Sequence, residues 1–414
     1  MLAALPLVVV PGQPGSFPIV DSQDPLNSTA AVTEFLYNEG QSPDSLTWDF
    51  SIHANIAGTR VDVDSPYVPF IKSLLAHGYT EGKDLFVAVA DWRLAAAPTD
   101  GVADGQLTGL TTAQLTDNTF EYGVDYLAYA IRKASQAWAN DHGGVAPPAV
   151  NVISHSYGYF LTRAYLASPD YGSPDLPPIN DFISMGGANE GVSIAYNWLN
   201  NNYVGPGSDP NQGGLYPILN LVYQDVAAGL ATVSRPNQPP ITADSIMNAQ
   251  GQPDPEIFVR QYIPAFRDIM ATYKFLDGKS INRNPAFRNN LLLDVNGGDD
   301  PNQFASLVGH VWDVYGATKT TPTTVSAKLG RGGKVLPVGQ DIFASHPVRT
   351  VPGQTWFRNN LRRYRGDTLI PPPSAVSTFR GDPRITLVPL GVTHSGMLTN
   401  RRVQKRIRGL LEMV

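Results

Sequence analysis

The sequence of 414 residues contains no cysteine. This absence excludes a disulfide framework, a thiolate nucleophile and any metal site that depends on cysteine ligands. The cellular compartment stays open, because a chain without disulfides can function inside or outside the cell. Between the two, we favour an extracellular protein whose leader has been removed over a cytoplasmic protein.

Long hydrophobic runs are also missing. No stretch approaches the ~18 consecutive apolar residues that cross a bilayer, so we expect a soluble or peripheral protein. The apolar N-terminus, residues 1–10, lacks the basic segment and the cleavage site of a secretory leader, and it runs directly into Pro11-Gly12. We therefore interpret Leu7–Val10 as a strand.

An excess of positive charge is absent as well. The formal net charge is −6, and the one basic cluster, Arg401 to Arg408, fits the solvated face of a last helix. We therefore do not expect nucleic acid as a partner. The acidic residues show no metal-ligand spacing, so we expect no metal ion and no organic cofactor. The sequence does not predict an oligomeric state.

The most informative stretch, residues 150–161, changes its hydrophobic period in the middle. Up to Ser154 it is a nearly continuous apolar run, typical of a strand buried on both faces of a parallel sheet, and after Gly158 it has the pattern of a helix. Ser156 lies at the join, where a tight strand-to-helix turn lifts a side chain clear of the sheet edge. The small residues Ser154 and Gly158 let such a turn close. The alternative is an ordinary turn between a strand and a helix.

Strand and helix patterns alternate along the rest of the chain. Helices are expected from Asp64 or Ser65 to Gly78, from about Phe120 through Ile131 to an end at Gly143-Gly144, and over Met397–Leu411. Short apolar runs predict further strands at Leu85–Ala90, Phe182–Met185, His310–Gly316 and Thr386–Leu390. This alternation predicts an α/β fold with a mostly parallel central sheet and helices on both faces.

We expect a single domain with two insertions. Its core comprises about residues 1–15, 66–190 and 309–414. Residues 16–65 have poor periodicity but many large apolar side chains, which favours a packed insertion and leaves a lipid-facing surface as the alternative. Residues 191–308 are rich in Gly, Pro and Asn and too long for a loop, so we interpret them as a cap or lid.

Three chemically competent residues follow strand ends in the order serine, acid, histidine: Ser156, Asp367 and His394. This is the triad order of the α/β hydrolases, so we expect that fold. A neutral imidazole takes the serine proton as the hydroxyl attacks an ester, and the carboxylate holds the imidazole tautomer. Other candidates are less well positioned in the pattern: Asp299, Asp300 and Asp313 for the acid, and His155 and His310 for the base.

The turn after the first strand, residues 11–15, supplies a candidate for the oxyanion hole. In such folds one backbone N–H comes from the loop after an early strand and a second from the residue after the nucleophile. These requirements indicate Gln13 and Tyr157. A sharp turn without this role is the alternative.

A set of short blocks, spread over nearly the whole chain, carries a family resemblance. The blocks are Val8-Val9-Val10-Pro11-Gly12, Gly78-Tyr79-Thr80-Glu81-Gly82-Lys83-Asp84-Leu85, Asp91-Trp92-Arg93, Phe182 to Val192, Tyr315-Gly316 with Thr320 and Pro322, Gly366-Asp367-Thr368-Leu369, and His394 with Met397-Leu398. In this order they resemble the lecithin:cholesterol acyltransferase and lysosomal phospholipase A2 family.

The resemblance implies a serine acyl hydrolase or acyltransferase that acts on lipid esters, with the triad and oxyanion donors named above. It implies that the region around Trp48 faces a membrane or lipoprotein and that the segment from residue 191 covers an acyl tunnel. Asp91 and Trp92, which lie in a shared block, join Trp48 as candidate substrate-binding residues.

The chain departs from the family pattern in three places. Ser154 stands where the family has Gly or Ala, and the Asp367-Thr368-Leu369 block is one residue shorter. The third departure is the disulfide around the lipid-facing tryptophan, which cannot form without cysteine.

We therefore predict that Ser156 forms an acyl-enzyme and passes the acyl group to water or to an alcohol. The expected partner is a lipid or other acyl ester, with a lipid interface as a further contact. One alternative is a short-chain or polymer esterase without lipid preference. A second is a hydrolase-fold binding protein without turnover, against which the complete triad argues.

Overall fold

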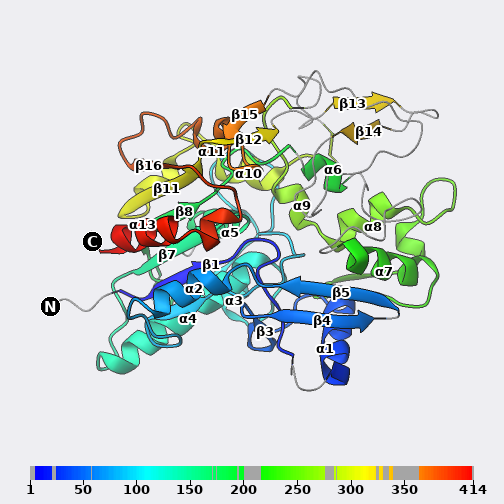
Figure 1. The fold of residues 1–414 in the computed structure, drawn as a ribbon, viewed down its shortest axis with the longest axis horizontal. Helices are drawn as coiled ribbons and strands as arrows, with labels where there is room; N and C mark the ends of the chain where they lie inside the picture. Colours follow the sequence, from blue (N-terminus) through cyan, green and yellow to red (C-terminus); the bar gives the residue numbers. More distant parts are fainter. Residues whose placement is uncertain are drawn as a thin grey trace.

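The computed structural model has a central sheet of six parallel strands (Figure 1). It describes residues 5–20, 25–56, 58–169, 171–173, 175–193, 195–199, 216–275, 284–285, 287–322, 326–329, 335–338 and 363–412. The strands, in their order across the sheet, are β16 (Ile385–Leu390), β11 (His310–Gly316), β8 (Ile179–Met185), β7 (Val150–His155), β1 (Leu7–Val10) and β6 (Leu85–Val87). The predicted α/β class is confirmed.

Two neighbouring inner strands, β7 and β1, are buried along their whole length. Their apolar, β-branched residues suit a strand that is covered on both faces. The register pairs Val8 with Phe86 on one side and with Val152 on the other. Because all six strands are parallel, their carboxyl ends meet at one edge, and the loop residues that follow them gather there.

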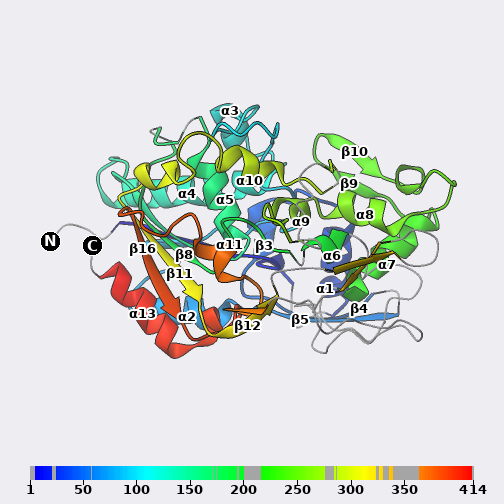
Figure 2. The ribbon, with the colours of Figure 1, turned by 90° about the horizontal axis from the view of Figure 1, so that it is seen from above.

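Helices cover both faces of the sheet (Figure 2). On one face lie α4 (Gly123–Asp141) and α5 (Gly158–Leu166), and on the other lie α2 (Val68–Leu75) and α13 (Arg401–Leu411). The predicted helix over Met397–Leu411 is wrong as a continuous element. Asn400 has an extended backbone and its side chain accepts the N–H of Arg402, so a short helix, α12 (Gly396–Thr399), ends before α13 begins.

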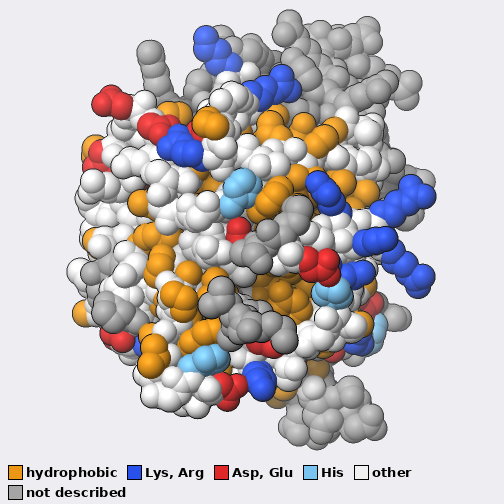
Figure 3. All heavy atoms as spheres, turned by 90° about the vertical axis from the view of Figure 1, so that its left-hand side faces the viewer, with side chains coloured by type: hydrophobic (Ala, Val, Ile, Leu, Met, Phe, Trp, Pro, Cys, Tyr) orange, Lys and Arg blue, Asp and Glu red, His pale blue; other side chains and the backbone are white. Residues whose placement is uncertain are grey.

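The basic cluster at the C-terminus is a solvated helix face. In α13, Val403, Ile407 and Leu410 are buried, whereas Arg401 and Arg406 are exposed. The apolar residues repeat at helical spacing, which turns the charged residues outward. Figure 3 views the molecule from the left-hand side of Figure 1 and shows Lys and Arg side chains gathered at one edge of that view.

The two insertions pack against each other in one lobe beside the sheet (Figure 1). The first contributes α1 (Pro25–Tyr37) and the hairpin β4 (Ser51–Ile56) and β5 (Thr59–Asp64), and the second contributes α6 (Ala195–Leu199), α7 (Tyr216–Ala227), α8 (Pro255–Tyr262), α9 (Ala265–Asp268) and the hairpin β9 (Val233–Arg235) and β10 (Gln238–Ile241). Helix α7 contacts β5, and α1 contacts β9. Regular structure therefore fills stretches in which the sequence shows little periodicity.

Other elements are short. They are β2 (Phe17–Pro18), β3 (Leu46–Thr47), α3 (Thr112–Thr116), α10 (Asn290–Val295), β12 (Lys319–Pro322), β13 (Ser326–Leu329), β14 (Val335–Val338), β15 (Arg363–Gly366), α11 (Pro372–Val376), and 3-10 turns at Pro43–Ser45, Asp244–Ile246 and Gln303–Ser306. Within the part of the chain described here, no helix is long and apolar enough to cross a membrane.

A buried ion pair joins the sheet to this lobe. The Asp91 and Arg93 side chains are both fully buried, with Arg93 Nη2 2.7 Å from Asp91 Oδ2. Arg93 also donates to the carbonyls of Leu36 and Asn38, at the end of α1, and to the hydroxyl of Tyr262 in α8. One guanidinium thus ties the loop after β6 to both insertions.

Removing the negative partner should be strongly destabilising. In Asp91→Asn the buried guanidinium of Arg93 keeps its charge and loses the carboxylate that it contacts, and we expect the free energy of unfolding to fall by ~3–5 kcal/mol in urea denaturation. The control is Asp44→Asn, which breaks the exposed Asp44–Lys133 pair and should cost ~1 kcal/mol or less. Equal losses in both variants would contradict this role.

Candidate active site

Ser156 lies on a strained turn between β7 and α5. Its φ is +55°, a region that residues other than glycine seldom adopt. The Ser156 N–H donates to the Met185 carbonyl at 3.1 Å, and the Ser156 carbonyl accepts the N–H of Tyr159 as the helix begins. The serine is therefore fixed by the neighbouring strand end on one side and by the first turn of α5 on the other.

Two glycines let the end of β1 approach this turn. A Cβ on Gly158 would lie 2.1 Å from the Val10 carbonyl oxygen, and a Cβ on Gly12 would lie 2.5 Å from the Ser156 Cβ. No other residue fits at either position without a shift of backbone. Ser154, two residues before the nucleophile, is fully buried and its hydroxyl has no partner among the described residues.

Asp367 and His394 form a hydrogen-bonded pair. The distance from His394 Nδ1 to Asp367 Oδ2 is 2.7 Å, and the His394 N–H donates to the Asp367 carbonyl at 2.6 Å. The other carboxylate oxygen accepts the N–H groups of Leu369 and Ile370 at 2.9 and 2.6 Å. Because Nδ1 carries the proton toward the carboxylate, Nε2 has the lone pair that a general base needs.

The backbone around Asp367 is closely packed and includes a residue with a positive φ. Thr368, the next residue, has a φ of +89°, unusual for a β-branched side chain, and its N–H donates to Thr321 at 2.9 Å. A Cβ on Gly316, at the end of β11, would lie 2.2 Å from the Asp367 Cβ. This glycine lets the acid reach the sheet edge, and such strain is common where side chains are held for chemistry.

The imidazole of His394 lies next to the serine turn. A Cβ on Gly186, the residue after Met185, would be 3.0 Å from two ring atoms of His394. The rings of His394 and His155 are 4.8 Å apart. His394 Nε2 is buried, and no described residue hydrogen-bonds to it. The structure thus brings Ser156, Asp367 and His394 to one edge of the sheet. The fold is that of the α/β hydrolases.

The predicted oxyanion donors, Gln13 and Tyr157, flank the same small cavity as Ser156. The Gln13 side chain donates to the Trp92 carbonyl at 2.6 Å, and the Tyr157 hydroxyl donates to the Leu94 carbonyl at 2.9 Å. Both side chains are therefore anchored away from Ser156. The positions of Gln13 and Tyr157 beside Ser156 keep their backbone N–H groups as candidate oxyanion donors.

His155 lies between the loop after β1 (residues 11–15, here called the oxyanion loop) and His394, the candidate base. The Tyr67 hydroxyl accepts the N–H of Gly12 at 2.5 Å and lies 2.9 Å from His155 Nδ1. His155 Nε2 lies 3.3 Å from the His394 carbonyl. Burial, reinforced by the neighbouring His394, lowers the pKa of His155 well below its usual value. A neutral ring protonated on Nε2 satisfies both contacts, since Tyr67 then donates to Nδ1.

Asp313, a rival for the acid, is fully buried inside the sheet. It lies opposite Ser184 in the neighbouring strand, and the Ser184 hydroxyl donates to it at 3.1 Å. Burial raises the pKa of Asp313 to about 8, although the hydrogen bond from Ser184 lowers it. No described histidine hydrogen-bonds to this carboxyl, so Asp367 is the acid that the geometry favours.

A small apolar cavity of about 30 Å³ opens beside Ser156. Its lining comes from the loop after β1, from α5, from the loop after β8, from α6, from the residue after α9 and from the loop after Asp367. The lining residues are Gln13, Ser156, Tyr157, Phe160, Ala188, Val192, Trp198, Ile269, Leu369 and Ile370. Phe160 could have been found from its position one helical turn after the nucleophile, whereas Trp198 and Ile269 lie in segments without any motif.

The predicted substrate-binding residues do not line this cavity. Trp48 is 7% exposed, and its indole N–H donates to Glu81 at 2.7 Å. The Asp91 carboxylate forms a buried ion pair with Arg93, and Trp92 is buried. The Asp91-Trp92 segment instead contacts a residue that lines the cavity, because the Trp92 carbonyl accepts a hydrogen bond from the side chain of Gln13.

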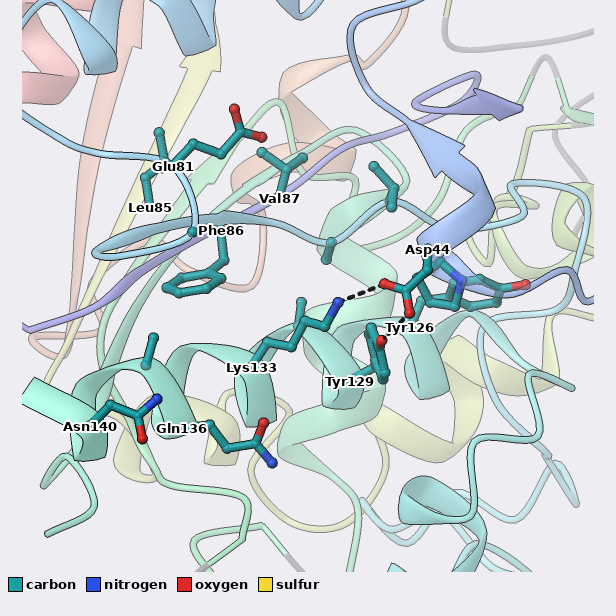
Figure 4. Close-up of a pocket in the computed structure, with 16 residues that line it drawn as sticks. Asp44, Glu81, Leu85, Phe86, Val87, Tyr126, Tyr129, Lys133, Gln136 and Asn140 are labelled. Carbon is teal, nitrogen blue, oxygen red and sulfur yellow. Dashed lines mark hydrogen bonds and ion pairs between the residues drawn. The ribbon is translucent and has the colours of Figure 1, made fainter. Parts of the chain in front are cut away.

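A larger cavity, of about 470 Å³, lies between the edge strand β6 and α4 (Figure 4). Lys133 and Tyr129 both point to Asp44 in this view, at 2.6 and 2.7 Å. The ion pair is largely exposed and therefore weak. No serine or histidine lines the cavity, so the chemistry rather than the volume identifies the candidate site.

Comparison with known proteins adds little beyond the fold. No protein-family model matches the chain, and no curated protein matches it significantly. A solved structure of a putative epoxide hydrolase from Pseudomonas aeruginosa aligns over 99% of this chain and 89% of its own, with 13% identity and a TM-score of 0.26. An alpha/beta hydrolase fold protein from Chitinophaga pinensis aligns over 69% and 72%, with 11% identity and a TM-score of 0.24. Likeness at this level carries no argument about the reaction.

Removing the Tyr67 hydroxyl should impair ester turnover more than folding. In Tyr67→Phe the Gly12 N–H loses its acceptor and His155 loses its donor, so the oxyanion loop and His394 are less well aligned. We expect kcat to fall by ~10–100-fold with KM little changed, measured by steady-state kinetics on an activated ester. Tyr165→Phe, which removes a buried hydroxyl from the far end of α5, is the control and should keep the parent kcat.

The Asp313 carboxyl should make stability depend on pH. It keeps its proton up to about pH 8 in the folded chain but loses it near pH ~4 when unfolded. Unfolding therefore releases a proton between these values, and stability contributed by the neutral carboxyl is lost as pH rises through this window. Asp313→Asn should reduce the difference between the urea midpoints at pH 5 and pH 8. An unchanged difference would show that Asp313 is ionised in the fold.

Proposed function

We propose that this protein is a serine acyl hydrolase or acyltransferase that cleaves carboxylic esters through an acyl-enzyme. The observation that carries the proposal is the 2.7 Å hydrogen bond between Asp367 and His394 at the sheet edge where Ser156 protrudes. A histidine whose Nδ1 is hydrogen-bonded to a carboxylate, and whose buried Nε2 has no partner among the described residues, has the arrangement of a general base.

The reaction follows from these roles. His394 Nε2 takes the Ser156 proton as the hydroxyl oxygen attacks the ester carbonyl carbon. The tetrahedral oxyanion is stabilised by the N–H groups of Gln13 and Tyr157, and Asp367 stabilises the imidazolium. Collapse breaks the bond to the alcohol, which leaves with the proton from His394. Water or a second alcohol then repeats the sequence on the acyl-enzyme and releases the acid or a new ester.

Lipid esters are the substrate class that the ordered sequence blocks favour. The apolar lining of the cavity beside Ser156 supports an ester with an apolar acyl group. The short-chain esterase stays the second candidate, because the same cavity is small. Contact with a lipid interface and transfer to an alcohol belong to the first candidate and are tested by product analysis on a phospholipid with and without a long-chain alcohol.

Covalent labelling tests the nucleophile. A fluorophosphonate probe should label the intact protein on one serine, and Ser156→Ala should abolish labelling and reduce ester hydrolysis by at least ~10³-fold. The control is Ser154→Ala, which removes a fully buried hydroxyl that has no partner among the described residues and should keep labelling. Equal labelling of the Ser156→Ala variant would refute the proposal.

A further inference from the structure

Packed side chains border the cavity beside Ser156. Phe160 comes from the first turns of α5, Trp198 from α6 and Ile269 from the end of α9. All three are buried. About 30 Å³ of free space remains between them and Ser156, which accommodates roughly two groups of the size of a water molecule or a methyl.

These walls are fixed to one another. Val192, which also lines the cavity, donates its N–H to the Ile269 carbonyl at 2.8 Å. Gly191 lies so close to the Met270 carbonyl that a Cβ would be 2.2 Å from its oxygen. The ring of Trp198 packs on Phe266 at 5.1 Å between centroids. The segments that follow β8 and α9 therefore form one packed wall rather than separate loops.

We propose that this cavity receives the acyl group and restricts the enzyme to esters of short acyl chains, of about two to four carbons. This selects the second candidate of the proposed function over lipid esters with long acyl chains. The inference rests on the proposed function, since it needs the acyl-enzyme at Ser156. A longer chain must push Phe160, Trp198 or Ile269 out of contacts that fill the interior. A single misfitting methylene in an apolar pocket changes specificity by ~10–200-fold, so the rate should fall steeply once the cavity is full.

The alcohol part of the ester is not restricted by this cavity. The acyl chain points to the apolar lining, and the leaving alcohol must be on the side of the carbonyl where His394 Nε2 can protonate it. A bulky or lipid-like alcohol that carries a short acyl group is therefore compatible with the same site. The cavity therefore limits the length of the acyl chain and leaves the size of the alcohol unrestricted.

The test is a chain-length profile on p-nitrophenyl acetate, butyrate, octanoate and palmitate. We expect kcat/KM of the intact chain to be highest for acetate or butyrate and at least ~10-fold lower for octanoate. Trp198→Ala should raise the octanoate-to-acetate ratio by ~10-fold or more by opening the wall. Ile269→Ala is a smaller change in the same wall and should shift the ratio in the same direction. It replaces Trp198→Ala as the test if that variant does not fold.

The matched control is Trp138→Ala. Trp138 lies on α4, stacks on His142 with ring centroids 3.9 Å apart and does not line the cavity. This variant loses the same side chain as Trp198→Ala and should keep the parent profile. A shifted profile in this control would overturn the assignment of the shift to the cavity wall.

Two results would overturn the inference alone. One is a wild-type optimum at octanoate or palmitate with Ser156 labelled by fluorophosphonate. The other is an unchanged profile in a folded wall variant, judged by its circular dichroism spectrum and unfolding midpoint. Absence of both labelling and ester turnover would instead remove the proposed function itself, so the two failures are distinguishable.

Discussion

The active-site geometry depends on the contact between the end of β1 and the serine turn. Gly158 packs against the Val10 carbonyl and Gly12 against Ser156 itself, each at a distance that excludes a Cβ. Two consequences follow. Ser156 is held at a strained φ by structure on both sides, and the loop that carries Gln13 starts next to it. Close packing of backbone, rather than any one side chain, aligns the two parts of the site.

Two adjacent residues in the loop after β1 are anchored by contacts with segments far away in the chain. The Gly12 N–H donates to Tyr67, and the Gln13 side chain donates to the Trp92 carbonyl. Trp92 in turn follows Asp91, whose ion pair with Arg93 reaches both insertions. The lobe beside the sheet therefore supports the loop through a buried chain of contacts, and losing the ion pair would affect the site as well as stability.

The sequence predicted those parts of the fold and site that depend on local patterns. Strands such as β7 were visible because burial on both faces leaves a continuous apolar run, and the positions of Ser156, Asp367 and His394 followed from parallel strands sharing one carboxyl edge. The break at Asn400 was missed although asparagine is a good helix cap. Trp198, Ile269 and Tyr67 could not be found, because their roles arise from contacts between segments far apart in the chain, which no local period reveals.

The electrostatics around His394 follow from burial. His155, with its ring 4.8 Å away, has a pKa well below its usual value, so it adds no positive charge beside the base. Asp313, inside the same sheet, has a pKa raised to about 8 and adds no second carboxylate at neutral pH. Asp367 differs from Asp313 because two backbone N–H groups and the His394 imidazole donate hydrogen bonds to its oxygens. Of these two acidic residues, Asp367 is therefore the one that orients the imidazole of His394.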